Sequence, residues 1–298
     1  MKAILTILYP SILAVSVSAC GQSKIIAFSK NCDSRHFQDS LIARYVDSGA
    51  EKLPYHYNNP AWGSYMDSII SICPHIATAY QLKAVPAIKN GEYIKAYALD
   101  EKAAQLDSPQ FVSYLGFLKC IFTKDYTGAI MDFNRANRII PGGAEMDHSF
   151  YFYLGLCYLE LEKYPDADVH FTRDLFSQNK GDSNVDIHFN SLLYKGITKL
   201  KLGQSDSAEI YLKKCLGIYE KLPEANYYLA LIYQKRKETN LEKKYLEMAR
   251  KSLLDGYSMN EDNLYYVNYP KQITLYEINK QLSALQERKR LDFNEQGF

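Results

Sequence analysis

The sequence predicts an all-α protein of about five helix–turn–helix repeats, with capping helices at both ends. The first observation is a recurring phrase, about 34 residues long, between residues 77 and 256. The second is the spacing of apolar residues within each copy, which alternates between three and four positions and is typical of amphipathic helices. The third is the composition, because 47% hydrophobic and 23% charged residues are typical of a globular chain and exclude a disordered one.

Each copy carries small residues where two helices are expected to cross. In the second helix an aromatic residue is followed three positions later by alanine, as in Tyr126–Ala129 and Tyr164–Ala167. Gly155 takes the small position in a first helix. Ala230 takes the same position in another first helix, and Ala96 and Ala208 take the alanine position of further second helices. Antiparallel helices approach closely only where a small residue faces a bulky one, so this pattern predicts tightly packed helix pairs.

This pattern resembles the tetratricopeptide repeat (TPR). The resemblance implies a TPR-type right-handed α-superhelix, in which the first helix of each pair lines a concave face. With the second-helix alanines aligned, the repeats span residues 77–109, 110–147, 148–188, 189–222 and 223–256. The fifth copy departs from the pattern, because Glu242 stands where the alanine is expected.

The segments on either side of the repeats are predicted to cap the stack. Residues 34–76 contain one apolar helical pattern over 35–48 and another from Trp62 to Cys73, separated by a proline-rich loop. Residues 257–298 begin with an aromatic stretch, 264–270, that is expected to be extended. The residues that share one helical stripe after it are Ile273, Ile278, Leu282 and Leu285.

The beginning of the chain is predicted to be an export signal. Lys2 precedes an apolar run, and Val17-Ser18-Ala19-Cys20 resembles a bacterial lipobox. The resemblance implies a signal peptide at 1–19, lipidation of Cys20 with palmitate-type acyl chains, and a tether over 20–33. Gly21 after the cysteine indicates a lipid-anchored protein of the bacterial cell envelope, at the outer membrane. A plain secretory signal with a chance cysteine is the alternative.

Export makes disulfide bonds permissible. Cys32 and Cys73 are the only cysteines outside both the lipobox and the repeats, so they form the candidate disulfide. Cys120, Cys157 and Cys215 fall on helical packing positions and are expected to be small buried residues.

The TPR resemblance also implies a set of residues that face the groove. The groove positions chosen for partner binding are Phe111, Tyr114, Leu118, Phe122, Phe152, Leu156, Leu193, Ile197, Tyr227 and Leu231. The polar side chains at equivalent positions are Ser149, Glu160, Asn190, Lys201, Glu224, Gln234 and Lys235. An apolar groove of this kind is expected to bind a hydrophobic or aromatic peptide segment. Two alternatives remain: these residues pack against neighbouring helices, or residues 264–270 occupy the groove themselves.

Signals for other functions are weak. The net charge of +1 excludes a strongly basic nucleic-acid-binding surface. The sequence contains no glycine-rich phosphate loop, nucleophile elbow or HExxH motif, so no catalytic residue and no cofactor is expected. His148, His170 and His188 suggest a zinc site only weakly, and no metal is expected; Asp147 is expected to cap a helix.

Together these observations predict a non-catalytic module for protein–protein interaction. The predicted protein is a membrane-anchored TPR lipoprotein that binds a peptide segment of an envelope protein in its concave groove, as a scaffold or assembly factor. The alternatives are an immunity or inhibitor protein that captures a single toxin, and an enzyme with a site at the centre of the groove.

Overall fold

The structure is a computed structural model that describes residues 31–179, 187–259 and 261–295. The predicted signal peptide, Cys20 and most of the predicted tether lie outside the described residues. The chain divides into two compact units, one ending at Lys83 and the other beginning at Ala84. No helix among the described residues is long and apolar enough to cross a membrane.

In the described part of the N-terminal unit, α-helices and short 3₁₀ turns surround a small apolar core. Helix α2 (Arg35–Ile42) begins at Ser34, whose hydroxyl accepts a hydrogen bond from the Phe37 amide, and continues as a π turn over Ala43–Asp47. Helix α3 (Trp62–Ile72) follows short 3₁₀ turns at Ala50–Lys52 and His56–Asn58. Trp62 is buried and donates its indole N–H to the Leu82 carbonyl at 2.8 Å. Cys32 and Cys73 are joined by a disulfide, with their Cα atoms 5.5 Å apart.

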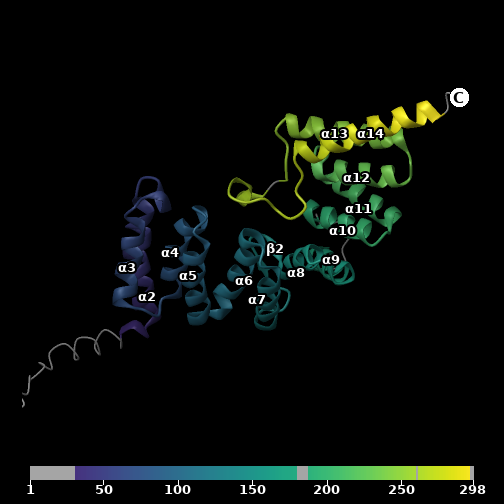
Figure 1. The fold of residues 1–298 in the computed structure, drawn as a ribbon. Helices are drawn as coiled ribbons and strands as arrows, with labels where there is room; N and C mark the ends of the chain where they lie inside the picture. Colours follow the sequence, from purple (N-terminus) through teal and green to yellow (C-terminus); the bar gives the residue numbers. More distant parts are fainter. Residues whose placement is uncertain (1–30, 180–186, 260, 296–298) are drawn as a thin grey trace, which may run out of the picture. The chain divides into compact units, whose positions relative to one another are not determined.

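The second unit is a stack of helix pairs (Figure 1). Helix α4 (Ala77–Lys89) contains the division between the units. The helices after it are α5 (Tyr93–Leu106), α6 (Ser108–Leu118), α7 (Tyr126–Ile139), α8 (Phe150–Glu160), α9 (Tyr164–Asn179), α10 (Phe189–Lys201), α11 (Ser205–Ile218), α12 (Pro223–Lys235), α13 (Thr239–Leu254) and α14 (Leu275–Glu295). The predicted all-α fold is confirmed.

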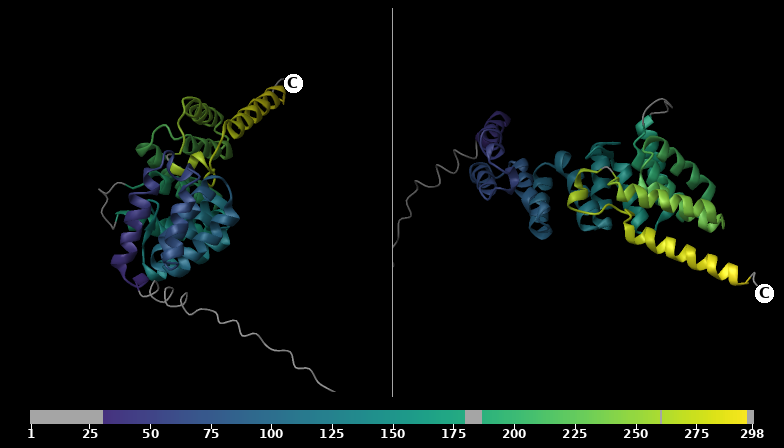
Figure 2. Two further views of the ribbon diagram at one scale, coloured as in Figure 1. Left: turned by 90° about the vertical axis from the view of Figure 1, so that its left-hand side faces the viewer. Right: turned by 90° about the horizontal axis from the view of Figure 1, so that it is seen from above.

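Packing follows the chain from pair to pair. Helices α6 and α7, α8 and α9, α10 and α11, and α12 and α13 pack as hairpins, and each second helix also packs on the first helix of the next pair. The first helices form an inner row in which α10 contacts both α8 and α12. Helix α14 runs alongside α13 (Figure 2). This arrangement is the predicted superhelix of helix pairs.

Glycines in first helices allow the two helices of a pair to approach closely. A Cβ atom added at Gly155 in α8 would lie 2.7 Å from the Phe171 ring of α9. One added at Gly196 in α10 would lie 2.7 Å from the Leu212 side chain of α11. Real Cβ atoms do not approach other heavy atoms so closely, so glycine is required at these crossings. The sequence pattern of small residues facing bulky ones therefore has the expected physical cause.

Gly155→Ala is expected to lower the free energy of unfolding by about 1–3 kcal/mol, because the new methyl group overpacks the contact with Phe171. The better helix propensity of alanine, about 1 kcal/mol, offsets only part of this loss. Gly217→Ala in α11 is the matched control, since a Cβ atom there meets nothing within 4 Å. Urea unfolding of the two variants measures the difference. Equal stability of both variants would contradict the packing argument.

Two details differ from the sequence predictions. Asp147 does not cap α8, because it lies in the turn of a two-stranded hairpin, β1 (Ala144–Glu145) and β2 (His148–Ser149), with φ of 65°. Ser149 is the cap instead, and its hydroxyl accepts a hydrogen bond from the Phe152 amide at 3.1 Å. Ile273 is not on the C-terminal helix, because α14 begins at Leu275. Ile273 is buried in the core of the stack before that helix starts.

A candidate interaction groove filled by the chain's own segment

The ten residues chosen from the sequence as groove residues come from α6 and the π turn that follows it, α8, α10 and α12. Eight of the ten are buried, whereas Tyr114 and Leu231 are half-buried. Nine of the ten belong to the apolar cluster of the second unit or pack against it; the exception is Phe111, which is buried but is not part of that cluster. These side chains are therefore packed between neighbouring first helices and are not free in the structure as it stands.

Residues 257–274 connect α13 to α14 and lie against the inner row of first helices; they are called the groove segment below. The segment leaves the end of α13 and reaches back over the middle of the stack before α14 begins (Figure 1). Met259, Tyr269 and Ile273 of the segment are buried in the same apolar cluster as the first helices. The stretch 264–270 was expected to be extended, but its first two residues belong to a short 3₁₀ turn, Asp262–Tyr265.

The repeats hold the groove segment through its main chain. Four side chains of the stack donate hydrogen bonds to carbonyl oxygens of the segment: Tyr194 to Pro270 (2.8 Å), Tyr228 to Lys271 (3.1 Å), Tyr219 to Ser258 (3.1 Å) and Lys124 to Asn268. Burial raises the pKa of Tyr194 and of Tyr228 well above the usual value for tyrosine. Both hydroxyls therefore stay protonated at neutral pH and remain donors.

A buried polar cluster fixes the middle of the segment. A carboxylate oxygen of Glu261 lies 3.0 Å from Nε2 of His148, and Asn190 donates its side-chain amide to the same oxygen. The His148 side chain is 3% exposed and the Glu261 side chain 10%, so this contact is shielded from water. The His188 ring lies 4.7 Å from the His148 ring, and burial, followed by the charge of His148, lowers the pKa of His188.

The histidines that suggested a metal site are only partly brought together. His148 and His188 are neighbours, but His170 lies elsewhere and stacks on Tyr158 at 5.1 Å between ring centroids. Burial, then the nearby Arg173 charge, lowers the pKa of His170 to about 4. Within residues 31–179, 187–259 and 261–295, no three His, Cys, Asp or Glu side chains are placed to hold a metal ion.

Charged groups hold two further points of the segment. Lys271 forms an ion pair with Glu160 at 3.0 Å. Lys89 donates to the Asn263 side chain at 2.9 Å and lies 3.9 Å from the centroid of the Tyr266 ring. A cation over an aromatic ring and a charged hydrogen bond both stabilise this arrangement.

The apolar residues of the groove were predicted from the repeat pattern, but the tyrosine hydroxyls that donate to the groove segment were not. Tyr194 and Tyr228 stand next to predicted positions, and both contact the groove segment through oxygen rather than through the ring alone. Of the polar side chains at equivalent positions, Glu160 and Asn190 contact the segment through an ion pair and a hydrogen bond. The signal was in the composition, because 26 tyrosines against one tryptophan favour amphipathic aromatic side chains that can pack and donate at once.

No family model matches the chain, and no curated protein matches it. Solved structures do match. The type IV pilus biogenesis factor PilW is 14% identical with a TM-score of 0.56, and the match covers 74% of this chain and 93% of PilW. A chain of the APC/C hetero-tetramer Cut9–Hcn1 is 18% identical with a TM-score of 0.54, and the match covers 78% of this chain and 43% of that one. YrrB, a TPR protein with an unusual peptide-binding site, is 20% identical with a TM-score of 0.48 over 64% of this chain and 93% of YrrB.

This chain thus spans less than half of the Cut9–Hcn1 chain that it matches. Identities below 25% bear on the fold alone. The paired helices, their close crossings at glycine and the likenesses to PilW and to the Cut9–Hcn1 chain agree, and the second unit has a TPR-type α-superhelical fold.

Proposed function

We propose that the chain is a non-catalytic protein-interaction module whose concave groove binds an extended peptide segment of a partner protein. The observation that carries this proposal is the binding of the groove segment through four of its main-chain carbonyl groups. Carbonyl groups are common to all peptides, so the same donors are suited to a segment of different sequence. The buried apolar side chains beneath supply the burial that favours aromatic or hydrophobic residues.

A partner segment competes with the groove segment for this surface. The groove segment is tethered at both ends, to α13 and to α14, and its effective concentration is therefore in the millimolar range or higher. The apparent affinity of a partner is reduced by the small fraction of chains in which the groove is open. This competition makes the groove selective for partners that bind strongly or at more than one place.

The proposed location is the bacterial cell envelope. The lipobox-like Val17–Cys20 sequence supports cleavage before Cys20 and anchoring through lipid, with residues 20–33 as the tether to the first unit. The similarity in fold to PilW, a type IV pilus biogenesis factor, is consistent with an assembly role at an envelope. We therefore propose a scaffold or assembly factor whose partner is an envelope protein.

Replacing residues 257–274 by a glycine–serine linker is expected to open the groove. The probe is a fluorescent peptide with the sequence of residues 257–274, measured by anisotropy against the linker variant and against the unaltered chain. The linker variant is expected to bind the peptide, and the unaltered chain to bind it far more weakly, because its groove is filled. Tyr194→Phe with Tyr228→Phe in the linker variant is expected to weaken binding about tenfold, since two hydroxyl donors are lost.

Circular dichroism establishes first that the linker variant remains helical. A folded linker variant without affinity for the peptide would contradict the groove as a binding site. If the linker variant does not fold, Tyr194→Phe with Tyr228→Phe in the otherwise unaltered chain gives the second test. That variant should show faster hydrogen exchange in residues 266–273, and unchanged exchange there would contradict the proposed anchoring.

A further inference from the structure

We propose that the second unit has a separate docking site, the groove between α13 and α14, which binds an amphipathic helix of a partner protein that carries acidic side chains. This surface is called the docking groove below. It is formed by the outer sides of the last two described helices and contains no residue of the groove segment. The inference therefore does not depend on what fills the concave groove.

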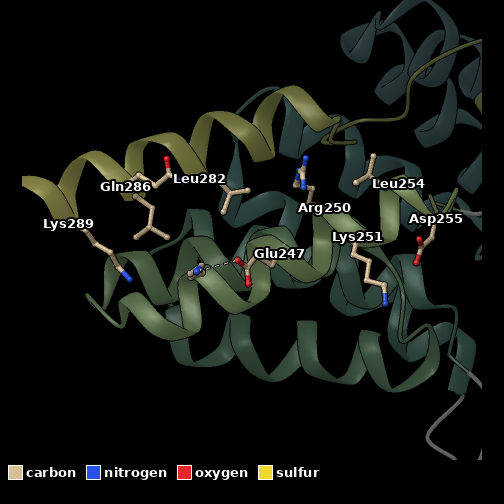
Figure 3. Close-up of a pocket in the computed structure, with 10 residues that line it drawn as sticks. Glu247, Arg250, Lys251, Leu254, Asp255, Leu282, Gln286 and Lys289 are labelled. Carbon is tan, nitrogen blue, oxygen red and sulfur yellow. Dashed lines mark ion pairs between the residues drawn. The ribbon is translucent and has the colours of Figure 1, made fainter.

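The docking groove is a cleft of about 470 Å³ with an apolar floor and a basic rim. Leu282 and Leu285 of α14 and Leu254 of α13 form the floor. Four basic residues line the cleft, Lys243, Arg250, Lys251 and Lys289, against two acidic ones, Glu247 and Asp255. Figure 3 shows Leu282 and Lys289 pointing from α14 towards α13 across this space. Leu254 is 58% exposed, so an apolar side chain is available at the surface.

The position of the groove within the stack favours a helix as its occupant. Helices α8, α10 and α12 each pack between the second helix of the preceding pair and the second helix of their own pair. Helix α14 packs on α13 as a first helix does, with Arg288 contacting Glu242 and Arg250 donating to Asn279 at 3.2 Å. Helix α13 packs on α12 as the second helix of its pair. The residues described up to Glu295 contain no helix that packs on α14 in the same way. A helix laid along α14 beside α13 would fill that place.

The charges of the stack indicate which helix would fit. Where the described residues of the stack join a first helix to a second helix through an ion pair, the cation lies on or just after the first helix and the carboxylate on the second. The pairs are Lys119–Asp132 (2.7 Å, from the turn after α6), Lys195–Asp168 (2.7 Å), Lys199–Asp168 (2.9 Å), Arg236–Asp206 (2.6 Å), Arg236–Glu209 and Arg288–Glu242. In all of them except Lys119–Asp132, the second helix belongs to the preceding pair. A second helix from a partner that follows this rule would present acidic side chains to α14.

Only one of the cations available for such a helix, Lys289, lies on α14 and follows this rule; Arg250 and Lys251 lie on α13 and add positive charge on the other side of the cleft. Among the described residues, Arg250, Lys251 and Lys289 form no ion pair with a carboxylate, whereas Lys243 is already paired with Glu247 at 3.5 Å. The excess of positive charge extends beyond the rim, because residues 195–290 contain 18 basic and 12 acidic residues. Complementary charge around an apolar floor favours an acidic amphipathic helix, in the helix-in-groove mode of recognition.

The test uses the full chain in a neutral detergent and a displayed library of amphipathic helices of about four turns. Leucines are fixed along one face, and the flanking positions are varied among glutamate, glutamine and lysine. Selection on the chain is expected to enrich glutamate at the flanks. Lys251→Glu with Lys289→Glu is expected to weaken the binding of an enriched helix about tenfold or more, because two attractions become repulsions.

Two control variants distinguish the docking groove from the rest of the charged surface and from the concave groove. Lys102→Glu with Lys214→Glu reverses two exposed charges on α5 and α11 and should leave the affinity unchanged. Tyr194→Phe with Tyr228→Phe alters the concave groove and should also leave it unchanged, which keeps this site distinct from the proposed function.

Three results would overturn the proposal. The first is enrichment of lysine, or of no charge, at the flanks of the selected helices. The second is equal binding of an enriched helix by the Lys251→Glu/Lys289→Glu variant. The third is binding to phosphatidylglycerol vesicles that this variant loses and that the enriched helices do not compete with, since the surface would then be a membrane contact.

Discussion

Replacing Asp100 by asparagine is expected to raise the free energy of unfolding by about 2–4 kcal/mol at pH 7. Asp100 lies in α5 and is 1% exposed. Among the described residues, neither of its carboxylate oxygens has a hydrogen-bond partner. Burial without compensation raises the pKa of Asp100 to about 8. The unfolded chain ionises this group near its ordinary pKa of about 3.9, so folding at neutral pH requires the carboxylate to bind a proton, and the free energy of that protonation opposes folding.

The sign of the pH dependence follows from this difference. Below about pH 4 the carboxyl is protonated in both states and makes no contribution. Between about pH 4 and pH 8 the folded state retains the proton that the unfolded state has lost, so stability falls by up to about 1.4 kcal/mol for each pH unit. Above about pH 8 the loss is complete, because both states are ionised. Asp100→Asn removes this slope while keeping the shape of the side chain.

Urea unfolding at pH 5, 7 and 9 measures the effect. The gain from Asp100→Asn should be smallest at pH 5 and should level off at pH 9. The matched control is Glu101→Gln, the exposed neighbouring residue on the same helix, which should show no such trend. A gain that is the same at all three pH values would show that Asp100 is not protonated in the folded state.

The helix pairs were predictable because their signals are local. A tyrosine followed by alanine, or a glycine opposite a phenylalanine, lies within about 20 residues of its partner and repeats along the chain. Gly155 and Phe171 illustrate this, since the contact joins two consecutive helices. The sequence could be scanned for such pairs without knowledge of distant contacts.

The sequence left it open whether the chain's own segment fills the groove, because this filling depends on contacts between residues far apart in the chain. Glu261 contacts His148, which lies 113 residues earlier, and no periodic pattern links them. Hydrogen bonds from tyrosine hydroxyls to carbonyl groups also leave no trace in the sequence of the segment that accepts them. Such contacts can be found only when the superhelix has brought the first helices together.

The start of α14 shows a signal that was present and overlooked. Apolar spacing extended the helix back to Ile273, although Thr274 and Glu277 form a capping arrangement that places the start at Leu275. The Glu277 carboxylate accepts the Thr274 amide at 2.8 Å, and the Thr274 hydroxyl accepts the Tyr276 amide at 3.2 Å. Periodicity therefore predicted the helix, and the cap would have corrected its boundary.

Loss of the Cys32–Cys73 disulfide is expected to lower the stability of the N-terminal unit by about 4 kcal/mol. The bond joins residues that are 41 positions apart in the sequence. In the chain-entropy description the stabilisation grows with the length of the closed loop, and this loop is of intermediate length. In the described residues of this unit, from 31 to 83, the core is built from α2, α3, the start of α4 and short turns, so few other contacts compensate. Cys32→Ala with Cys73→Ala is the variant that removes the bond.

Trp62 makes this prediction measurable within the intact chain. It is the single tryptophan of the sequence and lies buried in the core of the N-terminal unit, 3% exposed. Its fluorescence therefore follows the unfolding of that unit, while circular dichroism is dominated by the helices of the second unit. The fluorescence transition should shift to lower urea in the Cys32→Ala/Cys73→Ala variant, and the circular dichroism transition should shift far less.

Reduction of the unaltered chain with dithiothreitol should reproduce the shift, and the same treatment should not affect the Cys32→Ala/Cys73→Ala variant. An unchanged Trp62 transition after complete reduction would contradict a stabilising role for the bond. Because such bonds persist in oxidising compartments and are reduced in the cytosol, the N-terminal unit is expected to reach full stability only after export. The disulfide therefore connects the proposed location at the envelope to a measurable property of the folded chain, independently of any partner that the grooves bind.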